Sequence, residues 1–213
     1  MTAIRFVLLS DGSSDRALLP VLKWVLTQHP QVASIEGEWS DPRMLPPQRR
    51  QLHERIRHAL EAYEECNLLF IHRDAEKDPP ETRHAEIRAA LEKAQVKHAA
   101  VGVVPVRMQE AWLLFDEMAV RRAAGNPNGS TGLSIPQLSE LERLADPKEC
   151  LHELLRTASG LRGRKLKTFD PHKAAHLVAD RIEDFSPLRR LPAFRCLEQD
   201  VAQALRVLHE AEL

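Results

Sequence analysis

FVLLSDGSSDRALLPVL (residues 6–22) passes from four apolar residues into a short polar turn, and then into an apolar pattern of helical period. The turn holds two carboxylates, Asp11 and Asp15, with a glycine beside the first. This order predicts a strand, a loop and a helix, which is how a β-α-β unit begins. The two acids are either a solvated turn with a helix N-cap or part of a metal site.

Apolar runs elsewhere in the chain extend this pattern. Buried strands are predicted at residues 4–9, 67–72 and 99–106, with a weaker candidate at 32–39. Amphipathic helical patterns lie between or after them, at 18–26, 52–63, 87–94 and 111–118. The strands are apolar without clean alternation, which is typical of a parallel sheet covered on both faces. We therefore expect an α/β fold, with a mainly parallel, Rossmann-like sheet of about four strands flanked by helices.

The chain changes character near residue 125. Residues 126–133 follow Gly125 and are rich in Gly, Asn and Pro, which break regular structure, so they are expected to form a linker. Residues 1–125 then form the α/β domain. Residues 134–213 show helical patterns only and form a helical region packed on or beside that domain.

Composition restricts the classes of function. The 213 residues carry a formal net charge of −1, so no global attraction to nucleic acid or anionic membrane is expected. No apolar run approaches the roughly 20 residues that span a bilayer. Cys66, Cys150 and Cys196 are odd in number and widely spaced, which favours the cytoplasm over an oxidising compartment.

Acidic residues follow each of the three main predicted strands. Asp11 and Asp15 follow the first, Asp74 and Glu76 the second, and Glu110 the third. Ligands of parallel α/β sheets bind where the carboxyl ends of the strands converge. Carboxylates gathered there repel one another unless a cation or protons intervene, and oxygen ligands suit Mg²⁺ or Mn²⁺.

Each group also has a simpler interpretation. Asp11 and Asp15 suit a turn and an N-cap, residues 74–78 a solvated loop, and Glu110 the first turn of a helix. Taken singly, these interpretations do not explain why every strand ends in acids. The shared position favours a metal site.

At these residues the sequence resembles the TOPRIM (topoisomerase-primase) fold: a strand, acid-Gly-x-x-Asp, a helix, and a later strand followed by Asp-x-acid. The segment EAWLLFD (residues 110–116) resembles TOPRIM-like proteins of domain-of-unknown-function family 4276. The likeness extends into the helical tail. It implies a TOPRIM-like fold, bound Mg²⁺, and kinship with nucleases of the overcoming-lysogenization-defect type, which work with an ABC-type or AAA ATPase in phage defence.

The resemblance assigns roles residue by residue. Asp11 takes the place of the usual first-motif Glu, Asp74 and Glu76 take the Asp-x-Asp place, and Glu110 matches the third acid. These four are the expected catalytic and metal-binding residues, with Asp15 as a further metal ligand. Asp11 is one methylene shorter than Glu and Glu76 one longer than Asp, so the swaps either compensate or mark a chain that has lost cutting activity.

Basic residues supply candidate phosphate contacts. Arg73 either neutralises neighbouring acids or touches a phosphate, and Arg164, Lys165 and Lys167 lie in the densest basic patch of the chain. The patch is alternatively a solvated loop or a surface for an acidic partner. His172 and His176 have a zinc-compatible spacing, but no third ligand is evident, so a helix-surface pair is expected.

The sequence supports two main hypotheses. The first is a divalent-metal-dependent nuclease, acting on DNA in preference to RNA, gated by a partner ATPase; an oligomer is compatible with it. The second is a non-catalytic TOPRIM-like module that binds an ATPase or nucleic acid. A phosphohydrolase of small nucleotides is a weaker third. Convergence of the acids would favour catalysis, and their pairing with arginines would favour binding.

Overall fold

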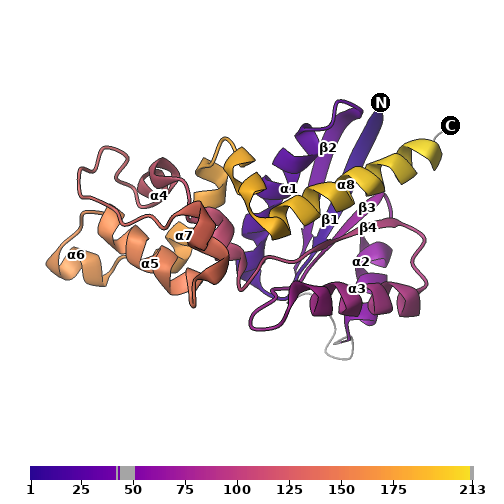
Figure 1. Cartoon of the computed structure of the whole chain (residues 1–213), viewed down its shortest axis with the longest axis horizontal. Coiled ribbons are helices and arrows are strands. Elements are labelled where there is room, and N and C mark those ends of the chain that lie inside the picture. Colours follow the sequence, from indigo (N-terminus) through magenta and orange to yellow (C-terminus); the bar gives the residue numbers. More distant parts are fainter. Residues whose placement is uncertain (42, 44–50, 212–213) are drawn as a thin grey trace.

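The computed structural model describes residues 1–41, 43 and 51–211, and its centre is a parallel β-sheet. The sheet contains β1 (Thr2–Leu9), β2 (Val32–Ser40), β3 (Leu68–His72) and β4 (Ala99–Val103) in the order β2-β1-β3-β4. All three neighbouring pairs are parallel, with Phe6 of β1 opposite Gly37 of β2 and Leu68 of β3. The predicted α/β fold with a four-stranded parallel sheet is confirmed (Figure 1).

Helices connect the strands and continue after the last of them. The helices that connect strands are α1 (Leu18–Thr27), α2 (Leu52–Ala62) and α3 (Pro80–Ala94). Those after β4 are α4 (Glu117–Ala123), α5 (Pro147–Ala158), α6 (Gly163–Lys167), α7 (Pro171–Arg181) and α8 (Pro192–Ala211). Short 3₁₀ segments are η1 (Ser13–Ala17), η3 (Gln109–Leu113), η4 (Leu138–Arg143) and η5 (Ser186–Arg190).

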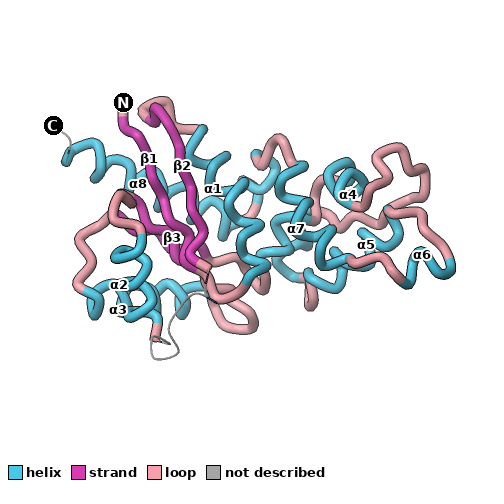
Figure 2. Tube along the Cα trace, turned by 180° about the vertical axis from the view of Figure 1, so that it is seen from behind, coloured by secondary structure: helices cyan, strands magenta, loops and turns pink. Residues whose placement is uncertain are grey.

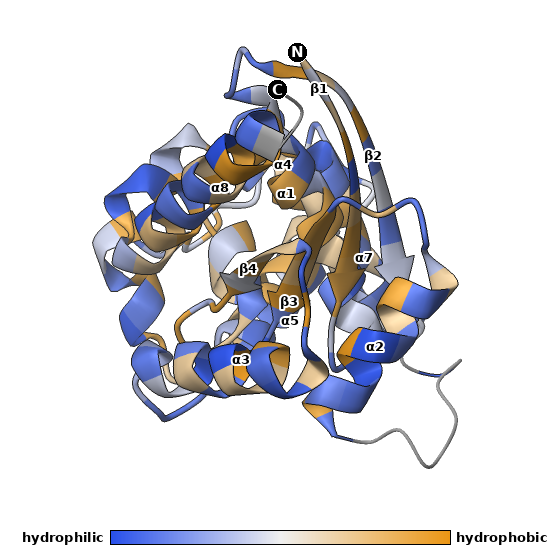
Figure 3. Cartoon of the chain, turned by 90° about the vertical axis from the view of Figure 1, so that its right-hand side faces the viewer, coloured by the Kyte–Doolittle hydropathy of each residue, from blue (hydrophilic) through white to orange (hydrophobic). Residues whose placement is uncertain are grey.

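The sheet is covered on both faces because alternate residues of each strand point to opposite sides. Ile4, Phe6 and Leu8 of β1 belong to a core shared with α1 and α8. Val7 and Leu9 point the other way, into a smaller core with α2 and α3. Figure 3 shows these two layers on either side of the strands. Burial on both faces explains why the strands read as continuous apolar runs.

The helices α4, α5, α6 and α7 form a helical lobe beyond the carboxyl ends of the strands (Figure 2). α7 contacts η1 and α1, and α5 contacts η3, so the lobe lies against the loops where ligands of such sheets bind. Residues 126–133 contain no helix or strand. The last helix, α8, leaves the lobe and packs on β4.

The helix predicted over residues 111–118 is wrong. Residues 109–113 form the 3₁₀ segment η3, and a separate helix, α4, begins at Glu117. The Asp116 side chain accepts a hydrogen bond from the backbone N–H of Ala119 at 2.9 Å and so caps the new helix. A cap in the middle of the apolar pattern divides it in two.

In the part of the chain that the structure describes, no helix is both long and apolar enough to cross a membrane.

Candidate active site at the carboxyl end of the sheet

Asp15 is the residue of the first loop that enters the candidate site. It lies in η1, 6% exposed, and its Oδ2 accepts the backbone N–H of Gly12 at 2.8 Å. Gly12 is therefore the N-cap of this turn, and Asp15 caps it from the third position rather than as the N-cap residue itself. Asp15 Oδ1 also accepts a hydrogen bond from Gln109 Nε2 at 3.0 Å, across 94 residues of sequence. The same carboxylate thus fixes its own turn and connects the loop after β1 to the loop after β4.

His72, the last residue of β3, lies next to the Asp15 carboxylate that makes this connection. Its side chain is 2% exposed, and Nδ1 lies 3.0 Å from the carbonyl oxygen of Val103. Because a carbonyl oxygen only accepts, Nδ1 must carry the proton. Nε2 then faces Asp74 Oδ1 at 3.4 Å and Asp15 Oδ2 at 3.9 Å. The histidine is therefore oriented by the sheet toward two carboxylates.

Asp74 is held by the loop after β4, and its surroundings raise the pKa of its carboxyl group. Its Oδ1 accepts the backbone N–H of Gln109 at 3.0 Å. Burial raises the pKa of Asp74 to about 6; His72 acts in the opposite direction, and the Asp15 and Glu110 carboxylates add to the increase. The charged form of Asp74 is thus disfavoured by burial and by two like charges.

Glu110, in η3, is the third carboxylate of this group. The residue is 7% exposed, and burial raises its pKa, with its own backbone amide and Lys148 opposing the increase and Asp15 adding to it. Asp15, Asp74 and Glu110, which we call the acid cluster, therefore come from three separate strand ends and act on one another. This convergence was expected from the sequence.

Asp11 is not brought into the acid cluster. Its Oδ1 lies 2.5 Å from Arg55 Nη1 and its Oδ2 lies 3.1 Å from Arg73 Nε. Arg55 comes from α2, is 10% exposed at its side chain, and also donates to the carbonyl oxygen of Ser10. A buried guanidinium needs a carboxylate partner, and Asp11 serves as that partner.

Glu76 is also directed away. Its backbone is left-handed (φ 55°) and its side chain is 67% exposed, with Oε2 3.7 Å from Arg83 Nη2. Arg83 lies 3.4 Å from Asp78 as well. The Asp-x-acid pair of the sequence motif is thus divided between the acid cluster and the solvent-exposed side of the loop.

The expected phosphate contacts lie in two different places. Arg73 follows the last residue of β3, and its guanidinium pairs with Asp11 and, at 3.5 Å from Nη2 to Oε2, with Glu86 of α3. Arg164, Lys165 and Lys167 lie on α6, which Figure 1 shows at the end of the helical lobe far from the sheet. Of these four residues, only Arg73 adjoins an acid of the cluster in the chain, because it precedes Asp74.

The lobe adds Lys148 and His152, which the sequence did not indicate, to the pair His172 and His176 that it did. A small pocket beside Glu110 is lined by Lys148, His152, His172 and His176. The rings of His152 and His172 meet edge to face, with centroids 4.3 Å apart. Burial lowers the pKa of His152, and His172 lowers it further. The expected surface pair on α7 therefore forms one wall of a pocket that opens beside an acid of the cluster.

The acid cluster offers hard oxygen donors of the kind that Mg²⁺ prefers. Both oxygens of Asp15 are engaged by donors, whereas among the described residues Asp74 Oδ2 accepts no hydrogen bond and Glu110 is approached only by its own amide. Within residues 1–41, 43 and 51–211, no group of three or more His, Cys, Asp or Glu could hold a metal ion. The donor chemistry fits a divalent cation that takes two protein carboxylates, with other ligands from outside the chain.

Sequence reasoning located the acid cluster but missed His72, Gln109 and Arg55. A polar residue at the end of LLFIH, in a strand otherwise apolar, was the available signal for His72. Gln109 precedes Glu110 and had no distinguishing pattern. Comparison of the chain with protein-family models, with curated proteins and with solved structures finds no match in any of the three, so the assignment of function depends on the geometry of this site.

Proposed function

We propose that the chain hydrolyses phosphodiester bonds of nucleic acid in a reaction that requires Mg²⁺ or Mn²⁺ at Asp74 and Glu110. The observation that carries this proposal is that two carboxylates from different strand ends, the buried Glu110 and the partly buried Asp74, both have raised pKa values at the carboxyl end of a parallel sheet. A cation relieves the repulsion that burial and like charge create there.

The proposed metal site has only two protein ligands, so most coordination positions of the ion remain for water and substrate. Mg²⁺ in proteins is commonly held by one or two carboxylates, keeps several waters, and completes its shell with substrate phosphate. Asp74 Oδ2 and the Glu110 carboxylate are the two protein ligands that the arrangement leaves free. Such an ion supplies charge stabilisation to the phosphate and a more acidic water.

The other residues of the site position these two. Asp15 and Gln109 join the loops that carry Asp74 and Glu110. His72 is fixed through Nδ1 and presents Nε2 to Asp74 Oδ1 at 3.4 Å. Arg73, 25% exposed at its side chain, borders the site and can bind a non-bridging phosphate oxygen.

A second candidate is favoured by the ion pairs of Asp11. If the first-motif acid serves only to hold Arg55 and Arg73, the chain is a binding module that recognises nucleic acid or an ATPase without cutting. The two candidates share the fold and differ in whether Asp74 and Glu110 are needed for turnover.

The test is a cleavage assay on labelled single-stranded and double-stranded DNA and RNA, with Mg²⁺, Mn²⁺ or EDTA. Asp74→Asn and Glu110→Gln should each reduce metal-dependent cleavage by about 100-fold or more, as expected when several kcal/mol of charge stabilisation are lost. Glu76→Gln is the matched control, because its carboxylate is exposed and outside the acid cluster. It should keep activity within about twofold of the native chain.

Metal binding is measured separately by Mn²⁺ electron paramagnetic resonance, with and without a phosphorothioate oligonucleotide. Binding should be weak alone, tighten with the oligonucleotide and vanish in the double variant of Asp74 and Glu110. Metal binding without cleavage of any substrate would favour the binding module. Undiminished cleavage by both single variants would contradict the proposed site.

A further inference from the structure

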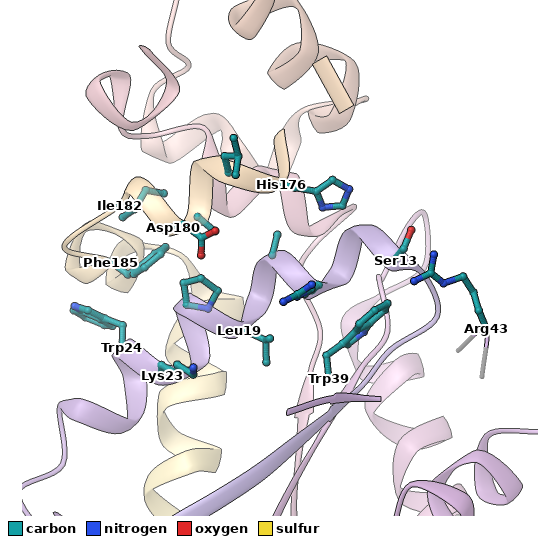
Figure 4. Close-up of a pocket in the computed structure, with 15 residues that line it drawn as sticks. Ser13, Leu19, Lys23, Trp24, Trp39, Arg43, His176, Asp180, Ile182 and Phe185 are labelled. Atoms are coloured by element: carbon teal, nitrogen blue, oxygen red, sulfur yellow. The ribbon is translucent and has the colours of Figure 1, made fainter. Parts of the chain in front are cut away.

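A large pocket lies between α1 and α7, with Trp39 of β2 at one end. Its volume is about 840 Å³, within the range of sites that bind nucleotide-sized ligands. Figure 4 shows its labelled side chains on η1 and α1, on β2 and at Arg43 after it, and on the segment from α7 to η5. The pocket therefore lies where the helical lobe meets the sheet domain.

Trp39 provides a fixed aromatic surface in this pocket. Its indole Nε1 donates to Ser10 Oγ at 2.9 Å, which fixes the ring relative to β1. The guanidinium of Arg43 lies over the ring, 5.9 Å from its centroid. A half-buried ring held at its edge can stack a base on the part of its surface that Arg43 does not cover, because every nucleobase presents a π-face.

The charges that line the pocket favour an anionic ligand. Arg16, Lys23 and Arg43 are the lining cations, and Asp180 is the lining carboxylate. Arg43 already pairs with Asp41. Arg16 and Lys23 are exposed, and neither forms an ion pair with a carboxylate in the part of the chain that the structure describes. Two unpaired cations on η1 and α1 are thus available to phosphate groups.

The pocket is adjacent to the small pocket beside Glu110. Ala17 and His176 line both this pocket and the small pocket that contains Glu110. η1, which carries Arg16, also carries Asp15 of the acid cluster. A chain-like ligand lying along Arg16 would therefore continue toward Glu110.

We infer that this pocket, which we call the α1–α7 groove, binds a single-stranded segment of nucleic acid, with a base on Trp39 and phosphates at Arg16 and Lys23. The inference deepens the proposed function and rests on it only for the direction of the strand toward Glu110. A single strand is favoured over a duplex because a base must be unstacked to lie on a protein ring. The groove would thus distinguish single-stranded from double-stranded nucleic acid at a position away from the cleavage site.

Binding is tested without catalysis, by fluorescence anisotropy of fluorescein-labelled dT₁₀ in EDTA over a range of salt concentrations. The double variant Arg16→Glu, Lys23→Glu should bind about tenfold or more weakly. Loss of two phosphate contacts should also reduce the slope of log Kd against log salt by about 1.4, from about 0.7 per contact on a single strand. The native chain should bind a duplex of equal length more weakly than dT₁₀.

Two charge-matched controls locate the effect. Lys97→Glu with Arg206→Glu changes exposed cations away from the groove and should leave both affinity and salt slope unchanged. Lys165→Glu with Lys167→Glu changes α6, the basic patch expected from the sequence to contact phosphate. Loss of binding in the α6 variant, with native binding in the groove variant, would overturn the inference.

Trp39 is tested by its own fluorescence. Trp24 also lines the groove, so the measurement is made in a Trp24→Phe background. Stacked bases should quench the remaining tryptophan emission, and Trp39→Phe should remove most of that quenching. Trp112→Phe should retain it, because Trp112 is completely buried in the core. Circular dichroism confirms that both variants are folded. Quenching that survives in Trp39→Phe would count against the stacking surface.

The outcomes separate this inference from the proposed function. Groove-dependent binding in EDTA, with no cleavage when metal is added, would leave the groove standing and remove the nuclease. If the Arg16→Glu, Lys23→Glu variant cleaves with the native rate and binds with the native affinity, the nuclease stands and the groove inference is wrong.

Discussion

At the scale of single residues, Asp74 is the group whose burial has the clearest thermodynamic consequence. Its pKa is raised to about 6 from the ordinary value of 3.8, chiefly by burial. The folded state therefore binds more protons than the unfolded state between about pH 4 and pH 6, and stability falls as pH rises through that window. Two pKa units correspond to about 3 kcal/mol, which is an upper limit for a side chain that retains some exposure.

Asp74→Asn should therefore stabilise the metal-free protein at pH 8, by about 1–3 kcal/mol, and change little at pH 4. The asparagine Oδ1 can still accept the Gln109 N–H, so the loop connection is kept. Urea unfolding in EDTA at the two pH values measures the difference. Asp78→Asn is the control, since this exposed partner of Arg83 should shift stability by less than about 0.5 kcal/mol at either pH. A destabilised Asp74→Asn at pH 8 would contradict the electrostatic account.

Spacing along the chain predicted which acids end each strand, but side-chain direction depended on residues far away in sequence. Asp15 and Glu110 act on each other through their charges, at the end of the sheet where both were expected. Asp11 is drawn to Arg55, 44 residues later, and this pairing has no sequence signal. Glu76 is turned outward by a left-handed backbone that glycine adopts more readily than glutamate. The position of the site in the fold was thus predictable from the sequence. Which of the acids turn toward it was not.

At the scale of elements, the pairing of β1 with β2 depends on one residue without a side chain. Gly37 lies opposite Phe6, and a Cβ added to Gly37 would lie 2.3 Å from the Phe6 ring. Phe6 is 1% exposed and meets Phe70 edge to face, with ring centroids 5.2 Å apart, so its ring has little freedom to move away. The close approach explains a glycine in the middle of a strand.

Gly37→Ala should destabilise the protein by about 1–3 kcal/mol, because overpacking forces the ring or the strand to shift. Chemical denaturation monitored by circular dichroism measures the change. Gly132→Ala is the matched control: its added Cβ would have nothing within 4 Å and should alter stability by less than about 0.5 kcal/mol. Equal stabilities for the two variants would mean that β2 moves freely relative to β1.

The elements themselves were largely predictable, because hydrophobic period is a local property. The strand predicted at 67–72 is Leu68–His72, and the weaker candidate at 32–39 is Val32–Ser40. The failure at residues 111–118 came from Asp116, whose capping role competed with a continuous apolar pattern. Pattern alone does not decide between one helix and two when a capping residue lies inside it.

At the scale of the whole molecule, the helical lobe and the sheet share one core. The larger core runs from Phe6 in β1 through Trp112 in η3 to Leu155 in α5 and Val201 in α8. α8 returns to the sheet after the lobe, although the chain passes residues 126–133 without regular structure. Composition indicated a change of character at that point, but it carried no information on where the last helix packs. A continuous core ties the walls of the α1–α7 groove to the acid cluster.

This continuity predicts one cooperative unfolding transition rather than two. Phe194 of α8 is the residue to test, since its ring meets Trp112 at 5.3 Å and Trp24 at 6.3 Å between ring centroids. Phe194→Ala should lower the stability by about 3–5 kcal/mol and shift the whole transition, because the cavity lies where sheet, η3 and α8 meet. Far-ultraviolet circular dichroism and tryptophan fluorescence should remain superimposable in the variant, and the calorimetric and van't Hoff enthalpies should agree. A variant in which one probe melts early while the other keeps its native midpoint would show that the lobe and the sheet fold independently, and the groove between them would then not be a fixed surface.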